Sequence, residues 1–213
     1  MFIRTIMAGA VALGLLAGGA SAATVTLTGG SPESLGTISG QDFTTELGAA
    51  GVTTLWRGPL SLTLNGPSRL TFSLVGAESS FNNSLELSGA TIISENADGS
   101  LPNFSTGALF GQTFTSGDYA AGTVISDLLT FTGPLGSVGA GEDEFGVFSN
   151  AAITGAGVST FFLSFDDDGA NSDDNHDDII VRVDVAAVPL PAAGWLLVAG
   201  LGGLAGMRRF RRA

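Results

Sequence analysis

Seven aspartates have the clearest capacity for chemistry, because they fall within thirteen positions between two apolar segments. They are Asp166, Asp167, Asp168, Asp173, Asp174, Asp177 and Asp178. Carboxylates confined to one connection repel one another unless a cation binds or water solvates them fully. Oxygen ligands in a flexible loop suit Ca²⁺, and Asp173, Asn175 and Asp177 alternate like the first ligands of a calcium loop. The stretch therefore predicts either a calcium site, with all seven aspartates as candidate ligands, or a solvated acidic turn.

The acidic stretch does not have the pattern of an EF-hand. If Gly169 is taken as the central glycine, Ser164 and Asn175 occupy the first and last ligand positions, where Asp and Glu belong. A glycine-rich nonapeptide repeat is also absent from the chain.

Other catalytic groups are scarce. The chain has no cysteine and one histidine, His176, which lies among the aspartates. Neighbouring carboxylates would hold this imidazole protonated or bound, so it is a poor general base and is expected to be a loop residue. Paired carboxylates can hydrolyse glycosidic bonds, and the candidates for that role are Glu46, Glu142, Asp143 and Glu144. We expect a protein that is not an enzyme, with a polysaccharide-acting enzyme as the least favoured alternative.

The charge distribution argues against nucleic-acid binding. The net charge is −12, and all eight basic residues are arginines. Only Arg57, Arg69 and Arg182 lie between the two ends of the chain, together with all 20 acidic residues. Such a surface repels phosphate backbones, so no nucleic-acid partner is expected.

The elements that must position the acidic stretch are strands. Apolar and polar residues alternate at period two over residues 60–64 and 70–74, and Asn65-Gly66-Pro67 between them predicts a hairpin. Further strands are expected at residues 24–28, 91–94, 109–114, 124–131, 145–148, 161–165 and 179–185. Turn residues recur about every ten positions, which is typical of an all-β sandwich or jelly roll. One such domain is expected over residues 23–185.

Two tripeptides match the glycosylation pattern. Asn82-Asn83-Ser84 and Asn103-Phe104-Ser105 are formal sequons, and both are interpreted only as exposed turns.

The N-terminal segment is typical of a secretory signal peptide. A positive charge at Arg4 precedes an apolar run over residues 6–19, and the small residues Ala20 and Ala22 follow it. These alanines match the −3 and −1 positions of a signal peptidase site, which predicts cleavage after Ala22 and residues 1–22 as the signal. An uncleaved membrane anchor is the alternative.

The C-terminal segment, residues 186–213, predicts a membrane helix. Residues 191–207 carry no charge, and a helix of that length spans about 26 Å, the lower limit for a bilayer. A stop-transfer cluster follows, formed by Arg208, Arg209, Arg211 and Arg212. The positive-inside rule keeps these arginines cytoplasmic and leaves the body outside. Both ends of the chain thus predict the same topology.

The same tail carries a recognisable motif. Val188-Pro189-Leu190-Pro191-Ala192, an apolar helix and a terminal arginine cluster occur in that order. The tail resembles the VPLPA-type variant of the PEP-CTERM sorting tails of Gram-negative bacteria. This resemblance implies cleavage near the proline motif by an exosortase-type enzyme, followed by release or attachment at the cell surface. A plain single-span anchor is the alternative.

The acidic stretch also resembles a motif found near the end of secreted PEP-CTERM-type proteins. An aromatic residue, acidic residues and a glycine precede an Asp/Asn-rich run and an aliphatic strand. The resemblance implies a β-sandwich module of unassigned activity, stabilised by calcium.

These observations favour an exported structural or adhesive protein of the cell surface or extracellular matrix. The expected partners are signal peptidase, an exosortase-type enzyme, the membrane through the C-terminal helix, and exopolysaccharide. A calcium-dependent carbohydrate-binding module is the main alternative. The expected route leads across the inner membrane to a membrane-anchored precursor and then to the cell surface or the exterior.

Overall fold

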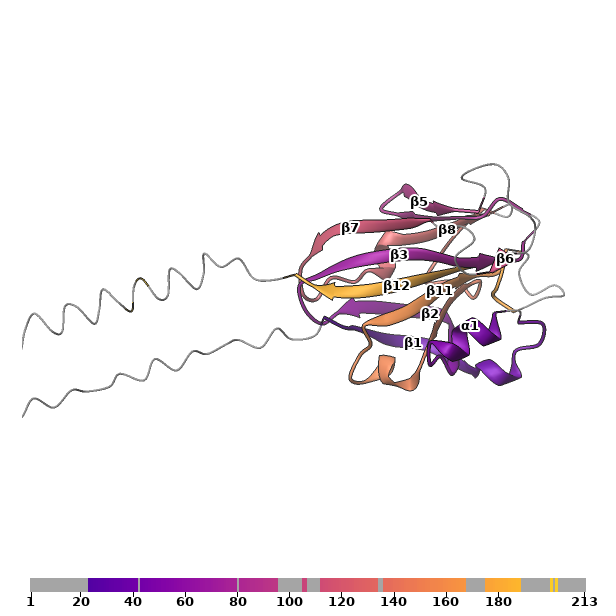
Figure 1. Ribbon diagram of the computed structural model, residues 1–213, viewed down its shortest axis with the longest axis horizontal. Helices are drawn as coiled ribbons and strands as arrows, with labels where there is room; N and C mark the ends of the chain where they lie inside the picture. The colour runs from indigo at the N-terminus through magenta and orange to yellow at the C-terminus, as the bar shows by residue number, and fades with distance from the viewer. Residues whose placement is uncertain are drawn as a thin grey trace, which may run out of the picture.

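The computed structural model describes residues 23–41, 43–79, 81–95, 105–106, 112–133, 136–167, 175–188, 200 and 202. These residues form two antiparallel sheets with few helices, which confirms the all-β, sandwich-like prediction (Figure 1). The predicted signal peptide with Ala20 and Ala22, the sorting motif after Val188 and the four terminal arginines lie outside the described residues. Within the described part of the chain, no helix has the length and apolarity needed to cross a bilayer.

The larger sheet has eight strands, and its main path runs β1–β2–β10–β11–β12–β3. The short strands β6 and β7 both pair with the remaining edge of β3. The strands are β1 (Val25–Ser34), β2 (Thr54–Leu64), β3 (Ser68–Ala77), β6 (Ser105–Thr106), β7 (Thr113–Tyr119), β10 (Phe145–Ser149), β11 (Thr160–Phe165) and β12 (Ile179–Ala187). The smaller sheet has the order β5–β4–β8–β9. Its strands are β4 (Ser84–Leu87), β5 (Ala90–Ser94), β8 (Leu129–Gly133) and β9 (Gly136–Gly139).

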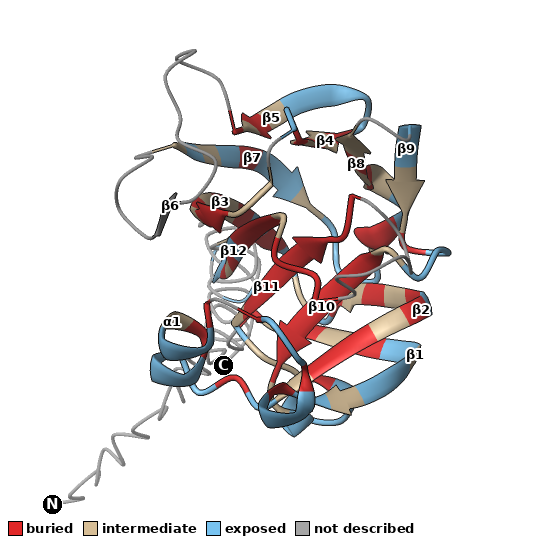
Figure 2. Ribbon diagram, turned by 90° about the vertical axis from the view of Figure 1, so that its right-hand side faces the viewer, coloured by how far each residue is buried: buried red, intermediate tan, exposed pale blue. Residues whose placement is uncertain are grey.

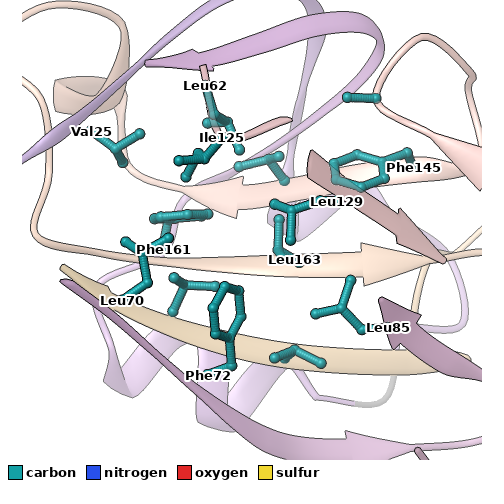
Figure 3. Close-up of a cluster of buried hydrophobic side chains, with 14 of the residues drawn as sticks. Val25, Leu62, Leu70, Phe72, Leu85, Ile125, Leu129, Phe145, Phe161 and Leu163 are labelled. Atoms are coloured by element: carbon teal, nitrogen blue, oxygen red, sulfur yellow. The ribbon is translucent and has the colours of Figure 1, made fainter. Parts of the chain in front are cut away.

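The main core lies between the two sheets, and Figure 3 shows part of it. Phe161, Leu163 and Phe165 alternate along β11 with residues that face the other way, so all three enter this core. From the smaller sheet, Phe131 stacks on Phe165 with ring centroids 5.2 Å apart and an interplanar angle of 3°. This pair fixes the separation of the sheets near the end of β11.

A second, smaller core covers the opposite face of the large sheet. Phe148, Phe162 and Ile180 point to that face. The segment between β1 and β2 packs on them, through the 3-10 helix η1 (Leu35–Thr37) and the helix α1 (Thr44–Ala49). Both faces of β10 and β11 are therefore buried (Figure 2), whereas β12 leaves Arg182 exposed.

The predicted hairpin at Asn65-Gly66-Pro67 is wrong. The connection is as short as expected, but β10, β11 and β12 lie between β2 and β3 in the sheet order, so these two strands do not pair. Only residues 54–56 of β2 pair with β10, whereas residues 60–64 pair with the start of β1. The β1–β2 ribbon bends where the β1 register shifts after Gly29. Gly29 has φ +76°, and a Cβ there would lie 2.5 Å from the Pro59 carbonyl oxygen, so only glycine fits this bend.

Residues 124–131 are also not one continuous strand. A 3-10 helix, η3 (Ser126–Leu128), precedes β8. The Leu62 amide donates to Ser126 Oγ at 3.1 Å, and the Ile125 amide donates to the Leu62 carbonyl at 2.8 Å. These bonds to the bent part of β2 replace ladder bonds, so the backbone can turn here. A further 3-10 helix, η4 (Ala151–Thr154), lies between β10 and β11.

Candidate functional site

The described aspartates of the acidic stretch gather where β11 ends and β12 begins. Asp166, Asp167 and Asp177 are buried and Asp178 is half-buried. Asp168, Asp173 and Asp174, the other predicted ligands, lie outside the described residues. The interpretation as a solvated acidic turn is therefore wrong for Asp166, Asp167 and Asp177. Burying carboxylates is costly unless hydrogen bonds or a positive charge compensate them.

The two strand ends are held together by one of these carboxylates. The Asp167 backbone N–H donates to Asp178 Oδ2 at 2.7 Å. On the other side of the strand end, the Asp166 N–H donates to the Glu144 carbonyl at 3.1 Å. The Asp178 carboxylate thus links the end of β11 to the start of β12 through a charge-assisted hydrogen bond.

Asp167 also reaches residues that are far away in the sequence. Its Oδ2 accepts a hydrogen bond from the Ser79 hydroxyl, just after β3. The same oxygen accepts from Asn83 Nδ2 at 2.5 Å, and Asn83 directly precedes β4 of the smaller sheet. The Asp167 carboxylate therefore joins the two sheets at this end of the sandwich.

Glu95 completes the arrangement from the end of β5. Its Oε2 accepts from the Asn83 backbone N–H at 2.6 Å, and its own N–H donates to the Asn83 carbonyl at 3.0 Å. Asn83 is 0% exposed and Glu95 is 3% exposed. The interpretation of Asn82-Asn83-Ser84 as an exposed turn is wrong for Asn83, because its amide is part of the buried network. We call Ser79, Asn83, Glu95, Asp167 and Asp178 the acidic cluster.

The surroundings of Glu95 in the acidic cluster shift its pKa. Burial raises the pKa of Glu95 from its ordinary value of 4.5 to about 8. The hydrogen bond from the Asn83 backbone opposes this change in pKa, whereas the negative charges of Asp167 and Asp178 add to it. The three arginines of the described body form ion pairs with Glu33, Asp118 and Asp184, none of which is a cluster residue. A proton or a cation from solvent is the natural counter-charge.

Two oxygens of the acidic cluster have no hydrogen-bond partner within the described part of the chain. They are Glu95 Oε1 and Asn83 Oδ1. Buried polar atoms in native proteins are nearly always paired with protein, water or an ion, and an unmade bond costs about 1–3 kcal/mol. These oxygens therefore indicate a ligand of positive character.

His176 lies at the same end of the sandwich as the acidic cluster but has different neighbours. It is fully buried and has φ 58°. The sequence predicted a loop residue at this position but not its burial. Its Nδ1 lies 3.0 Å from the position that a Cβ would take at Gly146 on β10. The segment before α1 covers this region, because Gln41 Nε2 donates to the Asn175 carbonyl at 2.8 Å. His176 thus faces the second core, whereas the acidic cluster bridges the two sheets.

The arrangement can hold positive charge, but it is not a preformed metal shell. Among the acidic and histidine side chains that the structure describes, no three already surround one metal position. Comparison with known families, curated proteins and solved structures found no significant match.

The sequence had no signal for the contributions of Asn83 and Glu95. Asn83 lies 84 positions before Asp167, and neither residue belongs to an acidic run. Only the packing of the two sheets brings them to the aspartates.

Proposed function

We propose that this chain is an exported protein whose β-sandwich serves as a structural or adhesive module at the cell surface or in the extracellular matrix. In this proposal residues 186–213, with the motif that begins at Val188, are the VPLPA-type sorting signal, and an exosortase-type enzyme processes it. The protein has no catalytic role in this proposal.

The observation that supports the proposal is where the two ends of the domain lie. The Val188 N–H donates to the Pro67 carbonyl at 3.0 Å, and the Asn65 N–H donates to the Thr24 carbonyl at 2.9 Å. The first and last described residues of the sandwich therefore meet at the connection between β2 and β3. A tail that begins after Val188 leaves the body from the end at which the N-terminal segment enters it.

The acidic cluster lies at the opposite end of the sandwich. β12 runs the length of the body, from the cluster at Ile179 to the tail end at Ala187 (Figure 1). Nine residues in a strand, at about 3.3 Å each, span nearly 30 Å. A body attached through its tail would therefore hold the acidic end away from the membrane.

Removing the tail tests the proposal. A chain that ends at Ala187, without residues 188–213, should move from the envelope fraction to the periplasm or the medium. The wild-type protein should show both processed ends by intact mass. Asp118→Asn is the control, since it changes an exposed ion pair with Arg69 and should leave the fractionation unchanged. An unchanged distribution of the truncated chain would refute the sorting role.

A calcium-dependent carbohydrate-binding module is the second candidate, favoured by the acidic cluster at the end remote from the tail. Exopolysaccharide from the producing cells should then be retained by the purified protein in Ca²⁺ and released by chelator. Asp167→Asn should abolish retention, whereas Asp118→Asn should not. Retention that is indifferent to both chelator and Asp167→Asn would exclude this candidate.

A further inference from the structure

We propose that the acidic cluster binds one Ca²⁺ ion that joins the two sheets of the sandwich, with oxygens of Asp167, Asp178, Glu95 and Asn83 as ligands. Two of these residues, Asn83 and Glu95, come from the smaller sheet and lie outside the acidic stretch. The site therefore shares Asp167 and Asp178 with the predicted loop site but takes its other two ligands from the smaller sheet. It also does not depend on export or on the sorting tail.

A continuous series of contacts brings the ligands together. Asp178 Oδ2 lies 2.7 Å from the Asp167 nitrogen, Asp167 Oδ2 lies 2.5 Å from Asn83 Nδ2, and Glu95 Oε2 lies 2.6 Å from the Asn83 nitrogen. Asn83 thus links Glu95 to Asp167, which in turn contacts Asp178. Asn83 and Glu95 are almost fully buried there.

The unpartnered oxygens point to the ligand independently of the acidic charge. Glu95 Oε1 has no hydrogen-bond partner among the described residues, although Oε2 of the same carboxylate is bonded. Asn83 Oδ1 is also unpartnered. In the structure Asn83 Nδ2 faces Asp167, so Asn83 would bind the ion after its amide turns by 180°, which exchanges the positions of oxygen and nitrogen. The oxygen would then face Asp167, and a cation bound by both oxygens would offset their repulsion.

The chemistry of the donors selects the ion. All four side chains offer oxygen, the chain has no cysteine, and the one histidine faces the second core near Gly146. Carboxylate and amide oxygens from irregular loop ends suit Ca²⁺, which tolerates variable geometry with 6–8 ligands. Mg²⁺ demands a nearly ideal octahedron, and Zn²⁺ prefers nitrogen and sulfur.

Binding of the ion should stabilise the fold because its ligands come from both sheets. Asp167 and Asp178 lie on the ends of β11 and β12, whereas Asn83 and Glu95 flank β4 and β5. The described side chains do not yet surround one point, so the ion must draw them together. A ligand that binds only the folded state raises its stability.

Calorimetry with Ca²⁺ alone, on the purified full chain, tests the inference. We expect one saturable Ca²⁺ per chain and a higher Tm in Ca²⁺ than in chelator. Glu95→Gln keeps the size of the side chain and should weaken binding about tenfold or more. The control Asp118→Asn removes a charge far from the cluster and should bind as the wild type does.

Two further variants separate the cluster from the acidic stretch. Asp173→Asn and Asp174→Asn should leave Ca²⁺ binding intact, because neither residue is among the four proposed ligands. No saturable Ca²⁺ binding, or binding lost in these two variants but kept in Glu95→Gln, would overturn the inference. Circular dichroism of Glu95→Gln in chelator verifies that the variant folds. Since binding is measured on purified protein, its failure is distinct from a failure of sorting in cells.

Discussion

The stability of the sandwich should depend on pH through Glu95 when cations are removed. The pKa of Glu95 is raised by burial to about 8 in the folded protein, and its ordinary value is 4.5. Below pH 4.5 both the folded and the unfolded chain carry this proton. Between pH 4.5 and 8 the unfolded chain loses the proton and the folded chain keeps it. The contribution of Glu95 to the free energy of unfolding is therefore fully present at low pH and is lost as the pH rises towards 8.

The expected size of the effect follows from the interval between the two pKa values. Each pH unit over which only the folded state holds the proton changes the free energy of unfolding by about 1.4 kcal/mol. From pH 4.5 to 8 this amounts to at most about 5 kcal/mol, a large part of the stability of a domain. Glu95→Gln has no titrating proton, so this part of the pH dependence should disappear.

Urea unfolding in chelator at pH 5, 6, 7 and 8 measures this difference. The stability of Glu95→Gln relative to wild type should increase steadily across the series, by several kcal/mol in total. Asp118→Asn should run parallel to the wild type, because its exposed ion pair contributes less than about 1 kcal/mol. If wild type and Glu95→Gln lose stability in parallel, Glu95 does not keep its proton in the folded state and the electrostatic reasoning is wrong.

Two further predictions concern packing at the same end of the molecule. Gly146→Ala should lower the free energy of unfolding by about 1–3 kcal/mol, because the new methyl group would collide with Ser164 Oγ and approach Leu55 at 2.9 Å. Ser164→Ala should recover part of this loss in a double-mutant cycle by urea unfolding, and strict additivity would argue against the collision. Phe165→Ala should cost about 3–5 kcal/mol in the same assay, since it removes a buried ring stacked on Phe131 across the sheets. A loss below about 1 kcal/mol would mean that this pair does not hold the sheets together.

Much of the β architecture could be predicted because its signal is local. The alternation at Phe161, Leu163 and Phe165 depends only on the twofold period of a strand, and all three residues enter the main core as that period requires. Which strands pair with one another, by contrast, depends on how the whole sheet assembles. Asn65-Gly66-Pro67 has the composition of a hairpin turn, yet three strands separate β2 from β3. The composition of a short turn cannot predict the bend of the β1–β2 ribbon at Gly29, which makes this separation of β2 and β3 possible.

The amino-acid sequence by itself determined the class of fold, the concentration of negative charge between the last two strands, and the apolar segments at both ends. Composition and short-range periodicity carry these properties. Only the tertiary structure decided that Asp167 is buried against Asn83 and close to Glu95, because those contacts exist only once the two sheets have packed. Burial and charge are properties of the surroundings, and here residues more than seventy positions away supply them.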